Sequence, residues 1–155
     1  MAAVVHQGEL LVGGPIVSAM ALDGSEPIAG ARRAARGFMT AVQGVHGIPV
    51  SDRAMSMVEL VVSELVTNAY KYAPGPCLLE LEVGAGVVEI SVWDTDAQLP
   101  AVSPADPSRI GQHGLEIAMA VCRSFEVRRE PVGKRVKVTI GLADDPGGDP
   151  AGRLP

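Results

Sequence analysis

Three polar side chains in the first half of the chain are spaced so that they could act on one ligand. Glu64 and Asn68 are four residues apart, and Lys71 follows three residues later. In a helix, residues at i and i+4 project from neighbouring turns of one face. A carboxylate can act as a base, an amide oxygen can bind a hard cation, and an ammonium can face a phosphate. An ordinary solvated helix flank is the alternative, and these residues alone do not decide between the two.

A carboxylate at the end of a predicted strand is the second candidate. Strand alternation places Asp94 on the face that also carries Val88, Ile90 and Val92, which is the face expected to cover the core. A carboxylate there is costly unless a group donates a hydrogen bond to it. Asp94 is therefore predicted to be a buried acceptor for a ligand N–H. The alternative is a strand-end residue that has already turned toward solvent.

A glycine-containing turn is the third candidate, formed by Gly111, His113, Gly114 and Leu115. It precedes a helix predicted from Gly114 to about Ser124. Glycine lets backbone N–H groups approach an anion, and a helix N-terminus favours negative charge. Glycine before a helix is common, and a histidine there is more often a plain loop residue. This turn alone is therefore weak support for a phosphate site.

The elements that must position these residues can be read from hydrophobic periodicity and from turn signals. Ser51 is a good N-cap for a helix that Pro74 ends, and its apolar stripe comprises Val58, Val61, Val62, Leu65, Ala69 and Tyr72. The other predicted elements are a helix over 27–45, a strand or two within 10–22, and strands at 77–83, 87–94, 125–130 and 135–142. Helices followed by a mostly antiparallel sheet predict an α+β two-layer sandwich.

The chain of 155 residues fits one domain, predicted over 9–143, with a flexible N-terminus at 1–8 and a disordered tail at 144–155. The segment 95–110 carries three prolines and no periodicity, as expected for a functional or disordered loop. Hydrophobic residues make up 47% of the chain and aromatic residues 3%, so the core is predicted to be aliphatic.

A net charge of −5 and a pI near 5.1 argue against direct binding to nucleic acid, which needs a basic face. The apolar stretch at 10–22 is too short to span a bilayer and follows no Lys or Arg, so we expect a cytoplasmic protein without a membrane contact. Cys77 and Cys122 lie in apolar runs without metal-ligand spacing. Both are predicted to be reduced core residues.

Taken together, these features resemble a known family. Residues 64–74, read as ELVTNAYKYAP, resemble the N-box of the GHKL-type ATPases, which include the histidine kinases. The later order also fits: an Asp ends a strand, a variable lid follows, and a glycine-containing turn opens a helix. With its small size and no separate phosphoacceptor domain, the chain resembles the anti-sigma-factor serine kinases, in particular the short actinobacterial regulators. The resemblance covers about residues 27–142.

The resemblance implies a Bergerat-type ATP-binding fold with ATP and Mg²⁺ as cofactors. It implies that Asn68 binds Mg²⁺, that Glu64 polarises the attacking hydroxyl of a serine, and that Lys71 lies near the phosphates. Tyr72, the next residue of the motif, is counted with the nucleotide-binding residues. Asp94 would accept a hydrogen bond from the adenine amino group. Gly111, His113, Gly114 and Leu115 would form the phosphate-side end of the lid.

The implied function is transcription regulation through proteins: the chain would hold a sigma factor inactive and phosphorylate a serine of a STAS-type anti-anti-sigma protein. Members of this family often form homodimers. Three departures favour a second hypothesis, an inactive partner-binding module on the same fold. The run after Asp94 lacks the family's two glycines, the glycine box near Gly111 is loosened, and Lys134 follows Gly133 where the family often places a threonine.

Overall fold

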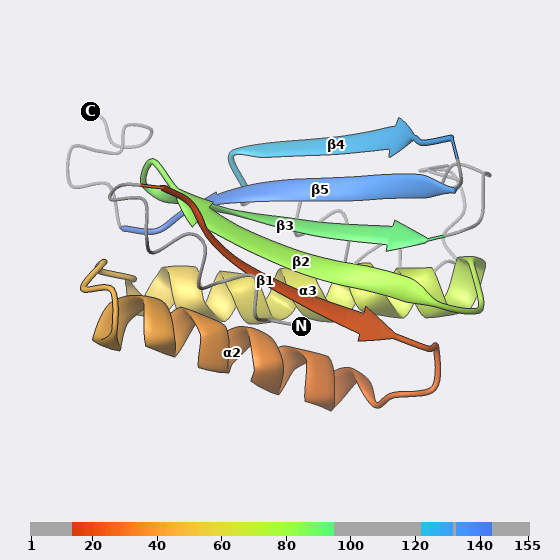
Figure 1. Cartoon of the computed structure of the whole chain (residues 1–155), viewed down its shortest axis with the longest axis horizontal. Coiled ribbons are helices and arrows are strands. Elements are labelled where there is room, and N and C mark those ends of the chain that lie inside the picture. The colour runs from red at the N-terminus through yellow and green to blue at the C-terminus, as the bar shows by residue number, and fades with distance from the viewer. Residues whose placement is uncertain (1–13, 95–121, 132, 144–155) are drawn as a thin grey trace.

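The computed structural model describes residues 14–94, 122–131 and 133–143, and these form two layers (Figure 1). Five strands make one sheet in the order β1-β2-β3-β5-β4, and every neighbouring pair is antiparallel. Two helices cover one face of this sheet, which confirms the predicted α+β two-layer sandwich. The elements are β1 (Ile16–Leu22), α2 (Ile28–Gly44), α3 (Asp52–Tyr72), β2 (Cys77–Gly84), β3 (Val87–Asp94), β4 (Ser124–Arg129) and β5 (Lys134–Gly141).

The predicted hairpin between β2 and β3 is confirmed, and its turn has a clear physical basis. Ala85 and Gly86, the two central residues, have φ angles of 53° and 80°. Positive φ at both positions is typical of a type I′ turn, whose twist matches that of the flanking strands. The turn sets the register in which Cys77, the first residue of β2, lies opposite Asp94, the last residue of β3.

Helix α3 begins and ends where the sequence predicts. The Ser51 side chain accepts a hydrogen bond from the backbone N–H of Ala54 at 3.0 Å, and so caps the first turn. The predicted apolar stripe is buried from Val58 to Ala69, but Tyr72 is 37% exposed, so its assignment to the stripe is wrong. The next position of the stripe, four residues after Ala69, is Ala73, which is 2% exposed.

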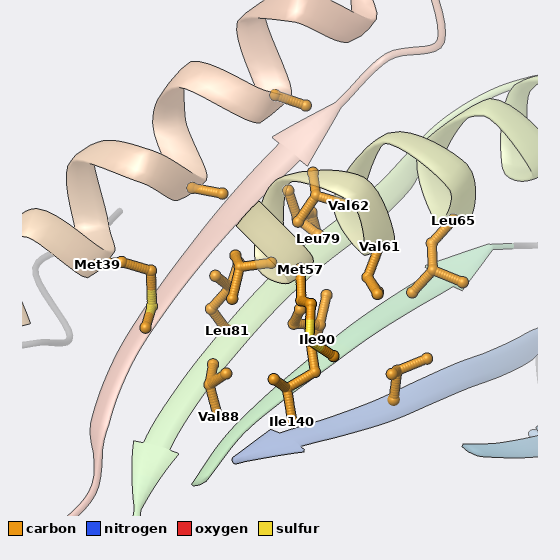
Figure 2. Close-up of a cluster of buried hydrophobic side chains, with 14 of the residues drawn as sticks. Met39, Met57, Val61, Val62, Leu65, Leu79, Leu81, Val88, Ile90 and Ile140 are labelled. Atoms are coloured by element: carbon orange, nitrogen blue, oxygen red, sulfur yellow. The ribbon is translucent and has the colours of Figure 1, made fainter. Parts of the chain in front are cut away.

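The core lies between the helices and the sheet, and it is aliphatic as predicted. Figure 2 shows side chains from α2, α3 and the strands packed together in this layer. Met39 comes from α2, Val61 from α3 and Ile90 from β3, and each is 0% exposed. No helix in the described part of the chain is both long enough and apolar enough to cross a membrane.

The prediction that the helix starting at 114 extends to about Ser124 is wrong. Cys122 and Arg123 are not helical, and Ser124 is the first residue of β4. The backbone N–H of Arg123 donates to the Thr139 carbonyl at 2.7 Å, because this segment already pairs with β5. Most of the predicted helix lies outside the described residues, as do the predicted flexible segment 1–8, the loop 95–110 and the tail 144–155.

Truncating Ile90 tests this packing. Ile90→Ala is expected to lower the free energy of unfolding by about 2–5 kcal/mol, and Ile90→Val by about 0.5–1.5 kcal/mol, because each leaves a cavity in a close-packed layer. Urea denaturation followed by circular dichroism measures both changes. Glu80→Ala, on a partly exposed position of β2, is the control and should change stability by less than about 0.5 kcal/mol. Equal changes in the free energy of unfolding for the three variants would contradict the assignment of Ile90 to the core.

Candidate functional site

The helix-facing side of the sheet is apolar along most of its length and becomes polar in its last cross-strand row. Residues directly opposite each other on antiparallel strands have side chains on the same face. The penultimate row consists of Met20, Leu79, Val92, Val136 and Val127. The last row consists of Leu22, Cys77, Asp94, Lys134 and Arg129. Chemistry-bearing groups are therefore concentrated at one end of the layer between sheet and helices.

Asp94 lies in the middle of this last row and is buried. Its side chain is 2% exposed, which confirms the predicted inward direction and excludes the alternative of a strand end turned toward solvent. The Lys134 ammonium donates to Asp94 Oδ2 at 2.8 Å, and the lysine side chain is 6% exposed. The two residues are directly opposite each other on β3 and β5.

Stability is a weak explanation for this ion pair. Removing two charges from water is costly, and apolar residues of similar volume often replace a buried pair with no loss of stability. Within the described residues, Ser91, Asp94 and Lys134 are the buried polar or charged ones. Sequence reasoning noted Lys134 only as a departure from a family pattern, because nothing in the sequence indicates that β5 lies directly beside β3.

The turn before β5 positions Lys134. Gly133 has a φ angle of 86°, a left-handed conformation that strongly favours glycine, and the backbone N–H of Glu130 donates to its carbonyl at 2.9 Å. This closed turn places Lys134 at the first position of β5, opposite Asp94. A larger residue in place of Gly133 would therefore be strained.

Asn68 carries the second distinctive group. Glu64 and Asn68 lie four residues apart on α3 and share a face, as predicted. Asn68 Oδ1 is buried and has no hydrogen-bond partner among the described residues, which is costly for an amide oxygen. A hard cation satisfies such an oxygen, so the residue fits a Mg²⁺ ligand.

The described residues contain no group of three or more His, Cys, Asp or Glu that could enclose a metal ion. Mg²⁺ in phosphate sites is commonly held by one or two protein ligands together with substrate phosphates and water. A single amide oxygen on α3 is compatible with that mode of binding.

Of the remaining predicted site residues, the structure describes Glu64, Lys71 and Tyr72 but not the lid residues. Lys71 and Tyr72 form the exposed last turn of α3, where Lys71 Nζ lies 5.5 Å from the centre of the Tyr72 ring. Glu64 is half-buried. The predicted lid residues Gly111, His113, Gly114 and Leu115 lie outside the described residues.

Burial and nearby carboxylates raise the pKa of two groups, Tyr70 near the end of α3 and Cys77 in the polar row. The Tyr70 hydroxyl donates to Glu26 Oε1 at 3.3 Å, and burial, followed by the charge of Glu26, raises the pKa of Tyr70 to about 12. Burial, followed by the nearby charge of Asp94, raises the pKa of the Cys77 thiol to about 11. Cys77 is therefore a protonated thiol at neutral pH. The prediction of a core position is confirmed for Cys77, which is buried, whereas Cys122 is only partly buried and packs against the core.

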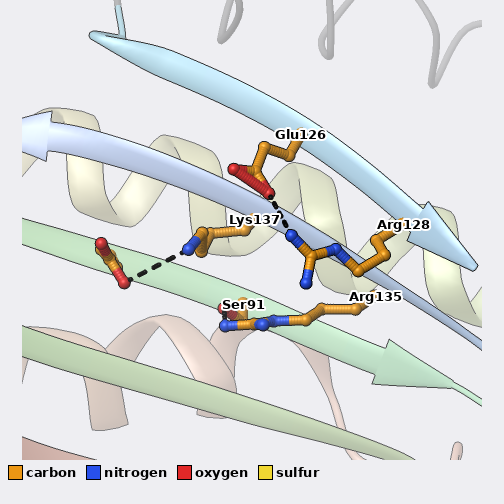
Figure 3. Close-up of polar contacts among 6 residues, drawn as sticks. Ser91, Glu126, Arg128, Arg135 and Lys137 are labelled. Atoms are coloured by element: carbon orange, nitrogen blue, oxygen red, sulfur yellow. Dashed lines mark hydrogen bonds and ion pairs between the residues drawn. The ribbon is translucent and has the colours of Figure 1, made fainter. Parts of the chain in front are cut away.

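The opposite face of the sheet carries a separate set of charges. Figure 3 shows Arg135 and Lys137 on the side that faces away from the helices. Lys137 Nζ lies 3.6 Å from Glu89, and the Arg135 guanidinium lies 4.8 Å from the centre of the Trp93 ring. Such partly exposed pairs contribute little to stability. The sheet separates them from Asp94 and Lys134.

Comparison with known proteins identifies the family of this chain. A sequence model of the histidine kinase-like ATPase domain matches residues 28–140, so the chain belongs to this family. Membership makes ATP the expected ligand of the site. Among solved structures, the chain is similar to the histidine kinase domain of the blue-light activated histidine kinase from Erythrobacter litoralis EL346. Sequence identity is 18%, coverage is 90% of this chain and 70% of that chain, and the TM-score is 0.48. No curated protein matches the sequence.

The pKa of Cys77 predicts how stability depends on alkaline pH. The thiol of the unfolded chain loses its proton near the ordinary pKa of 9.0, whereas the folded protein keeps it until about 11. Over this window the folded state binds more protons, so the free energy of unfolding falls as pH rises, by at most about 1.4 kcal/mol per pH unit.

Urea denaturation of the wild type and of Cys77→Ala at pH 8, 9, 10 and 11 measures this effect. The difference in stability between the two proteins should shrink steadily above pH 9. A difference that stays constant to pH 11 would show that the thiol does not hold its proton more tightly in the folded protein.

Proposed function

We propose that this chain is an ATP-dependent regulator of the anti-sigma-factor type, with its nucleotide site between the end of α3 and the last row of the sheet. The observation that carries the proposal is the burial of the Asp94 carboxylate on the helix-facing side of an otherwise apolar strand face. A buried carboxylate at the end of that face is suited to accept a hydrogen bond from an amino group of a ligand that enters the layer from this end.

The residues of the site then have distinct roles. Asp94 accepts a hydrogen bond from the adenine amino group, and Lys71 faces the phosphates. Asn68 Oδ1 contributes one ligand to Mg²⁺, an ion that neutralises charge developing on transferred phosphoryl oxygens. Glu64, one helical turn before Asn68, accepts the proton of an attacking hydroxyl group.

The proposed biological role is to hold a sigma factor inactive and to phosphorylate a serine of a STAS-type anti-anti-sigma protein. Support comes from the N-box resemblance at residues 64–74 and from the net charge of −5, which is unsuited to direct DNA binding. Leu60, which lies off the main apolar stripe and is partly exposed, is available for a homodimer or partner contact.

A specific observation also favours a second candidate, an inactive partner-binding module on this fold. The glycines expected after Asp94 are absent, and Lys134 in place of a threonine forms an ion pair with Asp94. Both differences lie at the adenine end of the proposed site, whereas Glu64 and Asn68 are retained. Phosphate transfer separates the two candidates.

Calorimetric titration with ATP tests the nucleotide site. The wild type should bind ATP saturably and more tightly with Mg²⁺ than without it. Asn68→Ala should remove the Mg²⁺ dependence, and Asp94→Asn should weaken binding at least tenfold with and without Mg²⁺, since a hydrogen bond to a charged group contributes about 1.5–3 kcal/mol. An absence of binding at millimolar ATP would refute the proposed site.

Substitution of Glu64 tests the transfer step. Glu64→Ala should lower the rate of phosphate transfer from γ-labelled ATP to a serine of a STAS-type protein about 10²- to 10⁴-fold, because the positioned base is lost. Its ATP affinity should stay within a factor of a few of the wild type. Glu80→Ala, on β2, is the matched control. If the wild type binds ATP but transfers no phosphate, the partner-binding module is the correct function.

A further inference from the structure

Two lysines of β5 lie in opposite environments, and the contrast singles out Lys134. The side chain of Lys137 is 20% exposed on the outer face and lies 3.6 Å from a partly exposed carboxylate, that of Glu89 (Figure 3). Lys134 is three residues earlier, on the helix-facing side, with its side chain 6% exposed and its ammonium 2.8 Å from buried Asp94. Lys137 is a partly buried lysine on the outer face of the sheet, whereas Lys134 lies within the proposed nucleotide site.

The chemistry of the pair defines what it can recognise. A carboxylate has about four lone-pair sites, so Asp94 can accept from Lys134 and from a ligand N–H at the same time. An ammonium has three donors and no acceptor, and one of them is directed at Asp94 Oδ2. The pair therefore presents an acceptor beside a donor in a largely dehydrated environment.

Adenine carries the complementary arrangement. Its exocyclic amino group is a donor, and it is flanked by ring nitrogens that are acceptors. A base whose amino group donates to Asp94 thus places a ring nitrogen on the side where Lys134 lies. Both contacts involve a charged group, and such hydrogen bonds are about twice as strong as neutral ones.

We propose that Lys134 is a base-contacting specificity residue. While Asp94 accepts a hydrogen bond from the amino group of adenine, Lys134 donates one to the ring nitrogen beside that amino group. The inference rests on the proposed function, since it requires a nucleotide in this site. It gives the buried ion pair a role in recognising the base. Lys134, at the position where the family often places a threonine, would then contact the base directly.

The test compares the affinities of ATP, 1-deaza-ATP and 7-deaza-ATP, the analogues in which one flanking ring nitrogen is replaced by C–H. The wild type should bind one of the two analogues about tenfold to a hundredfold more weakly than ATP, the range expected for a hydrogen bond to a charged group. Lys134→Met should bind ATP as weakly as the wild type binds the weaker analogue. It should also bind ATP and that analogue with equal affinity. Lys137→Met, the matched control on the outer face, should behave as the wild type.

The outcomes are distinct. Equal affinity of the wild type for ATP and both analogues would overturn the proposal even if Lys134→Met fails to fold, and would leave ATP binding itself intact. Tighter ATP binding by Lys134→Met would also overturn it, because the ammonium would then compete with the base. If the wild type binds none of the three nucleotides at millimolar concentration, the proposed function fails, and this inference fails with it.

Discussion

The apolar face of α3 must be buried against the sheet, and the rest of the molecule is arranged around that constraint. Val58, Val61, Val62 and Leu65 repeat at helical spacing, and all are buried in the layer that α3 shares with β3 and β5. Helix α2 packs beside α3 and closes the same layer with Met39. Because apolar burial is the dominant favourable term in folding, this packing holds α3 against the two strands that carry Asp94 and Lys134.

A site at the end of an apolar layer has particular electrostatic properties. Asp94 and Lys134 are held where water is largely excluded, so their interaction with each other and with a ligand is stronger than it would be at the surface. The pairs on the outer face, such as Lys137 with Glu89, are partly solvated and screened. The fold therefore places a partly solvated set of charges on one side of the sheet and the buried pair of the proposed site on the other.

Glu64 and Asn68 match the N-box motif that the sequence resembles, whereas the run after Asp94 and the residue after Gly133 depart from the pattern of that family. The Asp94–Lys134 ion pair, at the proposed base end of the site, distinguishes this chain from that pattern under both proposed functions. Asn68 Oδ1 is buried and has no hydrogen-bond partner among the described residues, and a bound cation would remove the energetic cost of this. The proposed site therefore depends on the buried Asp94–Lys134 pair and on Asn68 Oδ1.

The sequence by itself determined the elements with strong local signals. The Ser51 cap, the stop at Pro74, the glycine hairpin and the strand alternation that turns Asp94 inward are all local, and all agree with the structure. The match of residues 64–74 to a family motif likewise predicted the family. Only the tertiary structure decided that Tyr72 is exposed, that Ser124 begins a strand, and that Lys134 lies against Asp94. The contact between Lys134 and Asp94 depends on which strands become neighbours, and the pairing of β3 with β5 is set by long-range packing, which no local pattern encodes.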